Sequence, residues 1–177
     1  MFKKFMTWLG RYRIINDRQT GEPYLERYYL FLKDRNKFPF NIFLHKFLKS
    51  DPDELHDHPW NYSTFIIKGG YWEWYPILND RGNVVGSSRT WRGPFTFRSA
   101  KANSMHRVEL EPGVTPWTIF IPGKKKKDWG FVIPKYVYDK TLGMDVINYT
   151  WVDHKTHLGD NVWQQTSNKE NLILAMM

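Results

Sequence analysis

Short strand-like segments recur along most of this chain, and residues that favour turns separate them. Residues 64–67 are β-branched and aromatic and precede Gly69 and Gly70, and residues 71–75 are aromatic around a central glutamate. Residues 79–83, Asn-Asp-Arg-Gly-Asn, have the composition of a hairpin turn. Apolar runs of this length between such residues favour strands over helices, so the pattern predicts an all-β sandwich or barrel.

The same criteria place further strands on both sides of this region. We expect Gly93 and Pro94 to precede a strand, and Pro122, Gly123 and Lys124 to open a turn. Residues 1–13 and 22–33 are expected to form short helix or edge strand, and the polar segment from Thr150 a tail. The additional predicted strands are residues 41–48, 95–97, 107–110, 117–121 and, as the last clear one, 129–133.

Length and composition exclude several classes of protein. A chain of 177 residues fits one domain, and 41% hydrophobic residues exclude disorder along its whole length. There is no cysteine, which excludes disulfides and cysteine-ligated metals. No apolar stretch is long enough for a membrane span, and residues 1–10 lack the features of a signal peptide. We therefore expect a soluble, cytoplasmic protein without a membrane partner.

The net charge of +8 is distributed unevenly. Residues 1–50 contain 11 Lys and Arg against 4 Asp and Glu, a local charge of +7, and a second basic run covers residues 124–127. Such asymmetry is compatible with a nucleic-acid or other anionic partner. No nucleic-acid-binding motif accompanies it, so we interpret it as a solvated basic face and the 124–127 run as a hairpin loop.

The histidines carry the strongest chemical signal. On an extended segment, alternation points His56 and His58 toward one side and Asp57 away from it, where Asp57 could pair with a basic group. Imidazole is the commonest metal-ligating side chain, so this pair forms half of a metal site. His106 shares parity with the apolar residues that follow it and is a candidate third ligand. His45 alternates with two phenylalanines and could also point inward.

Other polar residues are weaker candidates. If the alternation of residues 71–75 turns the odd positions inward, Tyr71, Glu73 and Tyr75 present polar groups to a cavity. An arginine could bind a substrate carboxylate or phosphate, although surface placement is the default for this residue type. His154 and His157 are expected to be solvated in the tail. The catalytic candidates are Tyr75, Glu73 and Arg107, and the substrate-binding candidates are Tyr71 and Arg98.

The combination of His56-Asp57-His58, Gly69-Gly70-Tyr71 and a later His106 resembles the two-motif pattern of the cupin superfamily. Several stretches also resemble a group of small cupin-like metal-binding proteins of bacteria and phages: residues 44–51, 55–60, 105–109 and 129–131. The resemblance covers about residues 40–135. It implies one double-stranded β-helix (jelly-roll) barrel at 40–149, with an N-terminal extension at 1–39 packing on it, a C-terminal tail at 150–177, and a homodimer.

One position departs from the family pattern. The usual glutamate of the first motif would fall at position 62 or 63, where Tyr62 and Ser63 stand. The resemblance then leaves two ligand sets open: three histidines, as in the thiol dioxygenase branch, or the same three with His45. Glu54 and Glu73 are weaker substitutes. A fourth histidine would favour a structural metal.

With only nitrogen and oxygen donors, the expected cofactor is one divalent metal ion, with Fe(II) favoured over Zn, Mn or Ni. The resemblance implies a metal-dependent oxidoreductase, of dioxygenase type, acting on a small molecule in the barrel. Two alternatives stay open at this point. One is a non-catalytic ligand-binding or isomerase-type cupin, and the other is a basic nucleic-acid-interacting protein.

Overall fold

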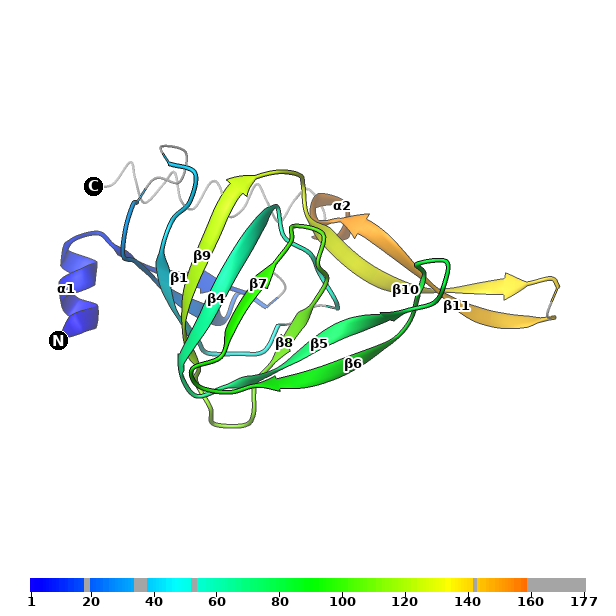
Figure 1. The fold of residues 1–177 in the computed structure, drawn as a ribbon, viewed down its shortest axis with the longest axis horizontal. Coiled ribbons are helices and arrows are strands. Elements are labelled where there is room, and N and C mark those ends of the chain that lie inside the picture. Colours follow the sequence, from blue (N-terminus) through cyan, green and yellow to red (C-terminus); the bar gives the residue numbers. More distant parts are fainter. Residues whose placement is uncertain (18–19, 34–37, 52–53, 142, 159–177) are drawn as a thin grey trace.

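Strands dominate the computed structural model, which describes residues 1–17, 20–33, 38–51, 54–141 and 143–158 (Figure 1). Two short helices lie at the ends of the described chain. The elements are α1 Phe2–Trp8, β1 Tyr12–Asn16, β2 Pro23–Tyr29, β3 Phe43–Phe47, β4 Trp60–Lys68, β5 Tyr71–Leu78, β6 Val84–Arg92, β7 Phe97–Ala100, β8 Arg107–Glu109, β9 Trp117–Lys125, β10 Gly130–Asp139, β11 Met144–Asp153 and α2 His154–Leu158.

The strands form three antiparallel sheets. Six strands pair in the order β1-β2-β3-β9-β4-β7, three in the order β6-β5-β8, and β10 pairs with β11. The predicted all-β class is confirmed. Within the described residues the pairings do not close into a barrel, and β1 and β2 from the expected N-terminal extension belong to the largest sheet.

The hydrophobic core joins the two larger sheets. Ile66 of β4 packs with Tyr71 of β5 and Val108 of β8, and all three side chains are buried. Phe47 of β3 and Leu110 border this cluster. Strand alternation explains the arrangement, because apolar residues at every second position of β4 and β5 face the same side. The core thus fixes β5 and β8 against β4, and these elements hold the candidate site.

Two predicted boundaries near the sheet were wrong. Phe95 adopts a positive φ of 64° in a turn, so the strand predicted at 95–97 begins only at Phe97. Pro122 does not begin a turn, because β9 continues to Lys125 and pairs with β4 along this length. Pro122 lies opposite an irregularity in the register between Trp60 and Tyr62, where a missing backbone donor is tolerated.

The hairpin of β10 and β11 was the main element that the sequence reasoning missed. The strand predicted at 129–133 extends to Asp139, and β11 returns antiparallel to it from Met144 (Figure 1, right). Thr150, the expected start of the tail, lies within β11. Residues 159–177 of that tail lie outside the described residues. A signal was present in Gly143, which has a positive φ of 66° in the connecting turn.

Gly130 begins this hairpin at a point without space for a side chain. A Cβ atom there would collide with the backbone oxygen of Val152 and lie 2.8 Å from the ring of Trp151. We expect Gly130→Ala to destabilise the protein by roughly 1–3 kcal/mol, the usual cost of overpacking. Gly86→Ala is the matched control, because its Cβ would meet only Ile77 at 3.8 Å. Urea denaturation of both variants checks this, and equal unfolding free energies would contradict it.

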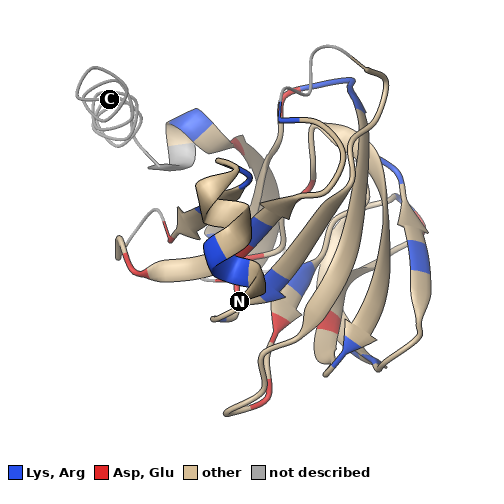
Figure 2. Ribbon diagram, turned by 90° about the vertical axis from the view of Figure 1, so that its left-hand side faces the viewer, with Lys and Arg blue, Asp and Glu red and all other residues tan. Residues whose placement is uncertain are grey.

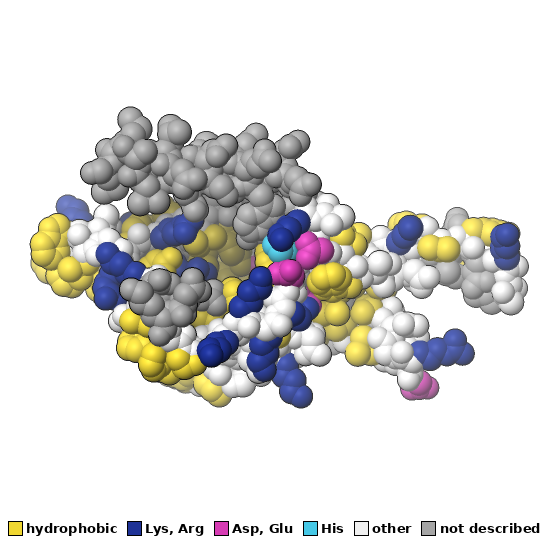
Figure 3. Space-filling model, turned by 90° about the horizontal axis from the view of Figure 1, so that it is seen from above, with side chains coloured by type: hydrophobic (Ala, Val, Ile, Leu, Met, Phe, Trp, Pro, Cys, Tyr) yellow, Lys and Arg dark blue, Asp and Glu magenta, His cyan; other side chains and the backbone are white. Residues whose placement is uncertain are grey.

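The basic residues of the N-terminal third lie on α1 and the neighbouring strands (Figure 2). Several of them contact other residues of the chain: Lys3 pairs with Glu26, and Lys49 pairs with both Asp17 and Glu22. Hydrophobic side chains of α1 are also exposed at this end of the molecule (Figure 3, left). None of the described helices is long and apolar enough to cross a bilayer. The cytoplasmic location and the nucleic-acid alternative stay predictions.

Candidate metal centre

Backbone pairing brings the His56–His58 segment against His106. The amide of each of His56 and His106 donates to the carbonyl of the other, both at 2.9 Å, which forms a bridge just before β8. The amide of His58 donates to the carbonyl of Ala102 at 3.1 Å. The segment that follows β3 is therefore held in an extended conformation, and His56 and His58 both contribute rings to one side of it, as predicted.

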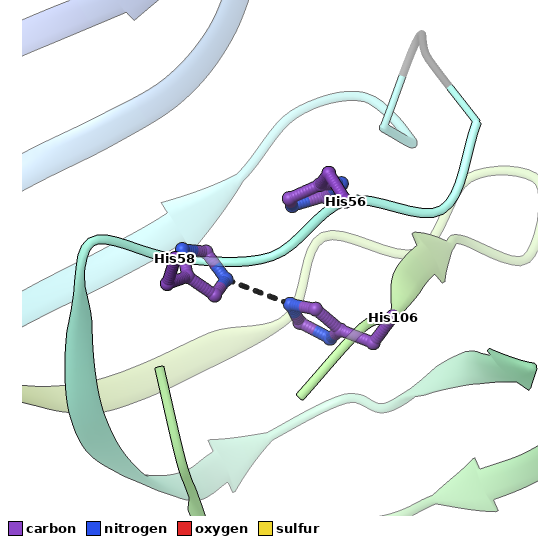
Figure 4. Close-up of side chains that lie close together, drawn as sticks. All are labelled: His56, His58 and His106. Carbon is purple, nitrogen blue, oxygen red and sulfur yellow. Dashed lines mark hydrogen bonds between the residues drawn. The ribbon is translucent and has the colours of Figure 1, made fainter. Parts of the chain in front are cut away.

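The three imidazole rings form a single cluster (Figure 4). One ring nitrogen from each of His56, His58 and His106 lies within 4.8 Å of the others. The Nε2 atoms of His58 and His106 are 2.8 Å apart, and the centroids of the His56 and His58 rings are 5.2 Å apart. Three converging imidazoles can bind one metal ion and leave other coordination positions open.

Glu73 of β5 fixes the orientation of the His106 ring. Its Oε1 atom lies 2.7 Å from Nδ1 of His106. Burial opposes ionisation of Glu73, but the hydrogen bond from His106 and the charges of His106 and Arg98 outweigh it and lower the pKa to about 2. Because the ionised carboxylate only accepts hydrogen bonds, Nδ1 carries the ring proton and Nε2 presents its lone pair to the cluster. Metal-ligating histidines are commonly held in this way.

The other two rings are also suited to metal binding. Desolvation lowers the pKa of His58 well below its usual value, and the neighbouring histidines and Arg98 act in the same direction. Desolvation likewise lowers the pKa of His56, although Asp51 partly opposes the shift. Both rings are therefore neutral at pH 7, and neutral imidazole is the form that binds metals.

Two arginines surround the far side of Glu73. Arg98 pairs with its Oε1 atom, and Nε of Arg92 donates to Oε2 at 3.1 Å. Tyr75 donates to the same Oε2 atom and accepts a 2.6 Å hydrogen bond from Arg92. The inward orientation of Tyr71, Glu73 and Tyr75 is therefore as expected. Arg92 was not predicted, because its contact depends on the pairing of β5 with β6.

Tyr62 is a site residue that the sequence reasoning placed only as a departure from a motif. Its hydroxyl group lies 3.2 Å from Nε2 of His106, and Nη1 of Arg98 donates to its oxygen at 2.7 Å. The side chain is buried, with 4% of its surface exposed. The signal was its position in the sequence, where the cupin pattern has a glutamate.

Asp57 points away from the cluster, as alternation predicts, and binds the base of the hairpin. Its carboxylate accepts hydrogen bonds from the amide of Gly130 at 2.9 Å and from Nε1 of Trp151 at 3.1 Å, and it pairs with Lys127. The interpretation of residues 124–127 as a solvated hairpin loop was therefore wrong. Lys124 and Lys125 belong to β9, and Lys127 is committed to the residue between two of the clustered histidines.

The structure places several other candidates away from the three rings. His45 lies on β3, where its Nε2 accepts a 3.0 Å hydrogen bond from Arg27 and its ring stacks on Phe120. Tyr71 belongs to the hydrophobic core. Arg107 lines a separate cavity of about 250 Å³ together with Glu54, Leu55, Trp74, Gly86, Ser87, Val132 and Tyr149.

His154 was expected to be solvated, and this was wrong. The residue is buried, with 5% of its surface exposed, because α2 follows β11 directly and packs on the start of the hairpin. Its ring stacks on Trp129 at 4.7 Å, and its Nδ1 atom lies 2.8 Å from the Trp129 carbonyl oxygen. The side chain of His157 lies outside the described residues.

No protein-family model and no curated protein matches the sequence. Solved structures do show similarity. Hydroxypropylphosphonic acid epoxidase from S. wedmorenis has a TM-score of 0.45 at 11% identity, over 64% of this chain and 56% of the epoxidase. A cupin-like protein from Thermotoga maritima gives 0.43 at 11% identity, over 74% and 77%. The polyketide cyclase RemF from Streptomyces resistomycificus gives 0.42 at 15% identity, over 58% and 68%.

These likenesses concern the fold alone, and the chain spans little more than half the length of the epoxidase. The cupin-like class of fold that the sequence predicts is confirmed. Together, the antiparallel sheets and the converging histidines define a cupin-like fold with a three-histidine cluster that could bind a metal ion.

Proposed function

We propose that this protein is a metal-dependent enzyme that holds one divalent ion at His56, His58 and His106 and acts on a small molecule. The observation that carries the proposal is the convergence of three ring nitrogens within 4.8 Å, one of them oriented by a buried carboxylate. A solvated or purely structural histidine does not need a second carboxylate partner of this kind. His45 is not part of the set, because its Nε2 atom is occupied by Arg27.

Fe(II) is the ion that we favour, by the resemblance to the three-histidine branch of the cupins, and Zn(II), Mn(II) and Ni(II) suit the same donors. A bound Fe(II) would supply redox chemistry with O₂, of the dioxygenase type. The contributions of the chain are distinct from this. Glu73 keeps the proton of His106 on Nδ1, and Arg98 and Tyr62 present polar groups beside the rings. The small-molecule substrate is part of this proposal, as is a homodimer.

Elemental analysis of protein purified without chelator or His-tag tests the metal site. The wild type is expected to contain close to one equivalent of metal, and His56→Ala/His58→Ala to contain almost none, because two of three ligands are lost. His45→Gln is the matched control, since it removes a buried imidazole outside the cluster, and it is expected to retain the metal.

The identity of the metal then decides among the proposed reactions. Iron that is lost in the double variant supports an oxygenase, and O₂ uptake with candidate small molecules is the next measurement. Zinc or nickel lost in the same way retains the site and favours hydrolysis or isomerisation. Folded wild-type protein that binds no metal even after reloading would overturn the proposal and leave a metal-free binding module as the better reading.

A further inference from the structure

We infer that Tyr62 is a fourth ligand of the metal, and that its phenolic oxygen replaces the carboxylate that the cupin pattern would place here. This inference rests on the proposed function, because it requires an ion at the three histidines. It concerns a residue that lies on β4, outside the histidine motif, and that the ligand sets considered from the sequence did not include.

The first argument is the position of the Tyr62 oxygen. It lies 3.2 Å from Nε2 of His106, and the same Nε2 lies 2.8 Å from Nε2 of His58. Nitrogen and oxygen ligands lie about 2.0–2.2 Å from such metals, so neighbouring ligand atoms of one ion are separated by roughly 3 Å. Both observed separations match this value. The oxygen is therefore positioned as a neighbouring ligand of the two nitrogens.

The second argument is that the Tyr62 ring has little freedom to leave this position. The side chain is buried, and the ring of His58 meets it edge-on with centroids 4.7 Å apart. The ring of Phe120 packs against it with centroids 5.2 Å apart. A rigid ring that already directs its oxygen at the cluster loses little conformational entropy on binding an ion.

The third argument is the charge beside the oxygen. Arg98 donates to it at 2.7 Å from a guanidinium that is itself fixed by Glu73. On coordination, an oxygen–metal bond would replace the phenolic O–H bond, and the proton would be released to solvent. The hydrogen bond from Arg98 would remain and would stabilise the resulting phenolate, because charge-assisted hydrogen bonds are about twice as strong as neutral ones.

Optical spectroscopy tests this directly. Apo-protein is loaded with Fe(II), the metal content is measured, and the ion is oxidised to Fe(III) with ferricyanide. A phenolate on Fe(III) produces a visible charge-transfer band, which histidine ligands alone do not. We expect the band in the wild type and in Tyr71→Phe, the matched control in the core, and its loss in Tyr62→Phe. Competition titration with Zn(II) is expected to show at least about tenfold weaker binding by Tyr62→Phe.

The outcomes separate this inference from the proposed function. Wild-type protein that binds one equivalent of iron without the band would overturn the role of Tyr62 and leave the three-histidine site intact. Wild-type protein that binds no metal would overturn both. Because the wild-type spectrum decides the matter alone, a Tyr62→Phe variant that failed to fold would not rescue the inference.

Discussion

Replacing Glu73 by glutamine is expected to lower the free energy of unfolding by roughly 3–5 kcal/mol and to weaken metal binding by about 10- to 100-fold. Glu73 has no exposed surface, and its carboxylate contacts His106, Arg98, Arg92 and Tyr75. Removing the negative charge leaves two arginines without their counter-ion in a largely buried position. It also removes the strong acceptor that holds the proton of His106 on Nδ1.

The pH dependence of stability provides a second readout. The pKa of Glu73 falls from 4.5 to about 2 in the folded protein. Because the folded pKa is the lower one, ionised Glu73 stabilises the fold above about pH 4.5, and this contribution is lost as the pH falls toward 2. The shift corresponds to roughly 3 kcal/mol. Glu73→Gln is therefore expected to flatten the stability profile between these pH values.

Chemical denaturation of apo-protein across this pH range, together with metal titration at neutral pH, checks both effects. Glu109→Gln is the matched control, because Glu109 lies on the neighbouring β8 and pairs with the exposed Arg89 at 3.0 Å. Exposed pairs of this kind contribute about 0–1 kcal/mol. If the two variants lost similar stability, or if Glu73→Gln kept the wild-type pH profile, the central role of Glu73 would be contradicted.

The sequence predicted the metal-binding face of the site through local periodicity. Alternation alone placed His56 and His58 on one side of their segment and Asp57 on the other, and parity turned Tyr71, Glu73 and Tyr75 inward. These inferences succeeded because a strand repeats its side-chain directions every two residues. The convergence of His106 with the pair also held, because the bridge between His56 and His106 keeps the segment before β8 regular.

Contacts between strands that are distant in the sequence could not be predicted in the same way. His45 faces inward as expected, yet β9 lies between its strand, β3, and β4, so its ring interacts with Arg27 and Phe120 instead. The role of Glu73 depends on its pairing with Val108, which places it beside His106. Local turn signals at Pro122 and Gly123 were outweighed by the pairing of β9 with β4. Register and strand order supply this information, and neither follows from periodicity.

Asp57 links the histidine pair to the β10–β11 hairpin, so Asp57→Ala is expected to affect both. The amide of Gly130, Nε1 of Trp151 and the amino group of Lys127 would all lose their acceptor. Unpaired buried donors and a broken buried ion pair together cost roughly 3 kcal/mol. The adjacent backbone of His56 and His58 would lose a fixed neighbour, and we expect metal affinity to fall by about tenfold.

Hydrogen exchange of the hairpin amides and metal titration measure these two effects. Asp128→Asn is the control, because Asp128 lies in the same loop as Lys127 but pairs with the exposed Lys125. A double-mutant cycle of Asp57→Ala with Lys127→Met isolates the contribution of the ion pair. Neutralising Lys124, Lys125 and Lys126 should leave both readouts unchanged, whereas Lys127→Met alone should reproduce part of the Asp57→Ala effect. If Asp57→Ala loosened the hairpin amides but left metal affinity intact, the hairpin and the histidine cluster would be independent units. If both changed together, the residue between the two histidines would be the connection through which the hairpin supports the site.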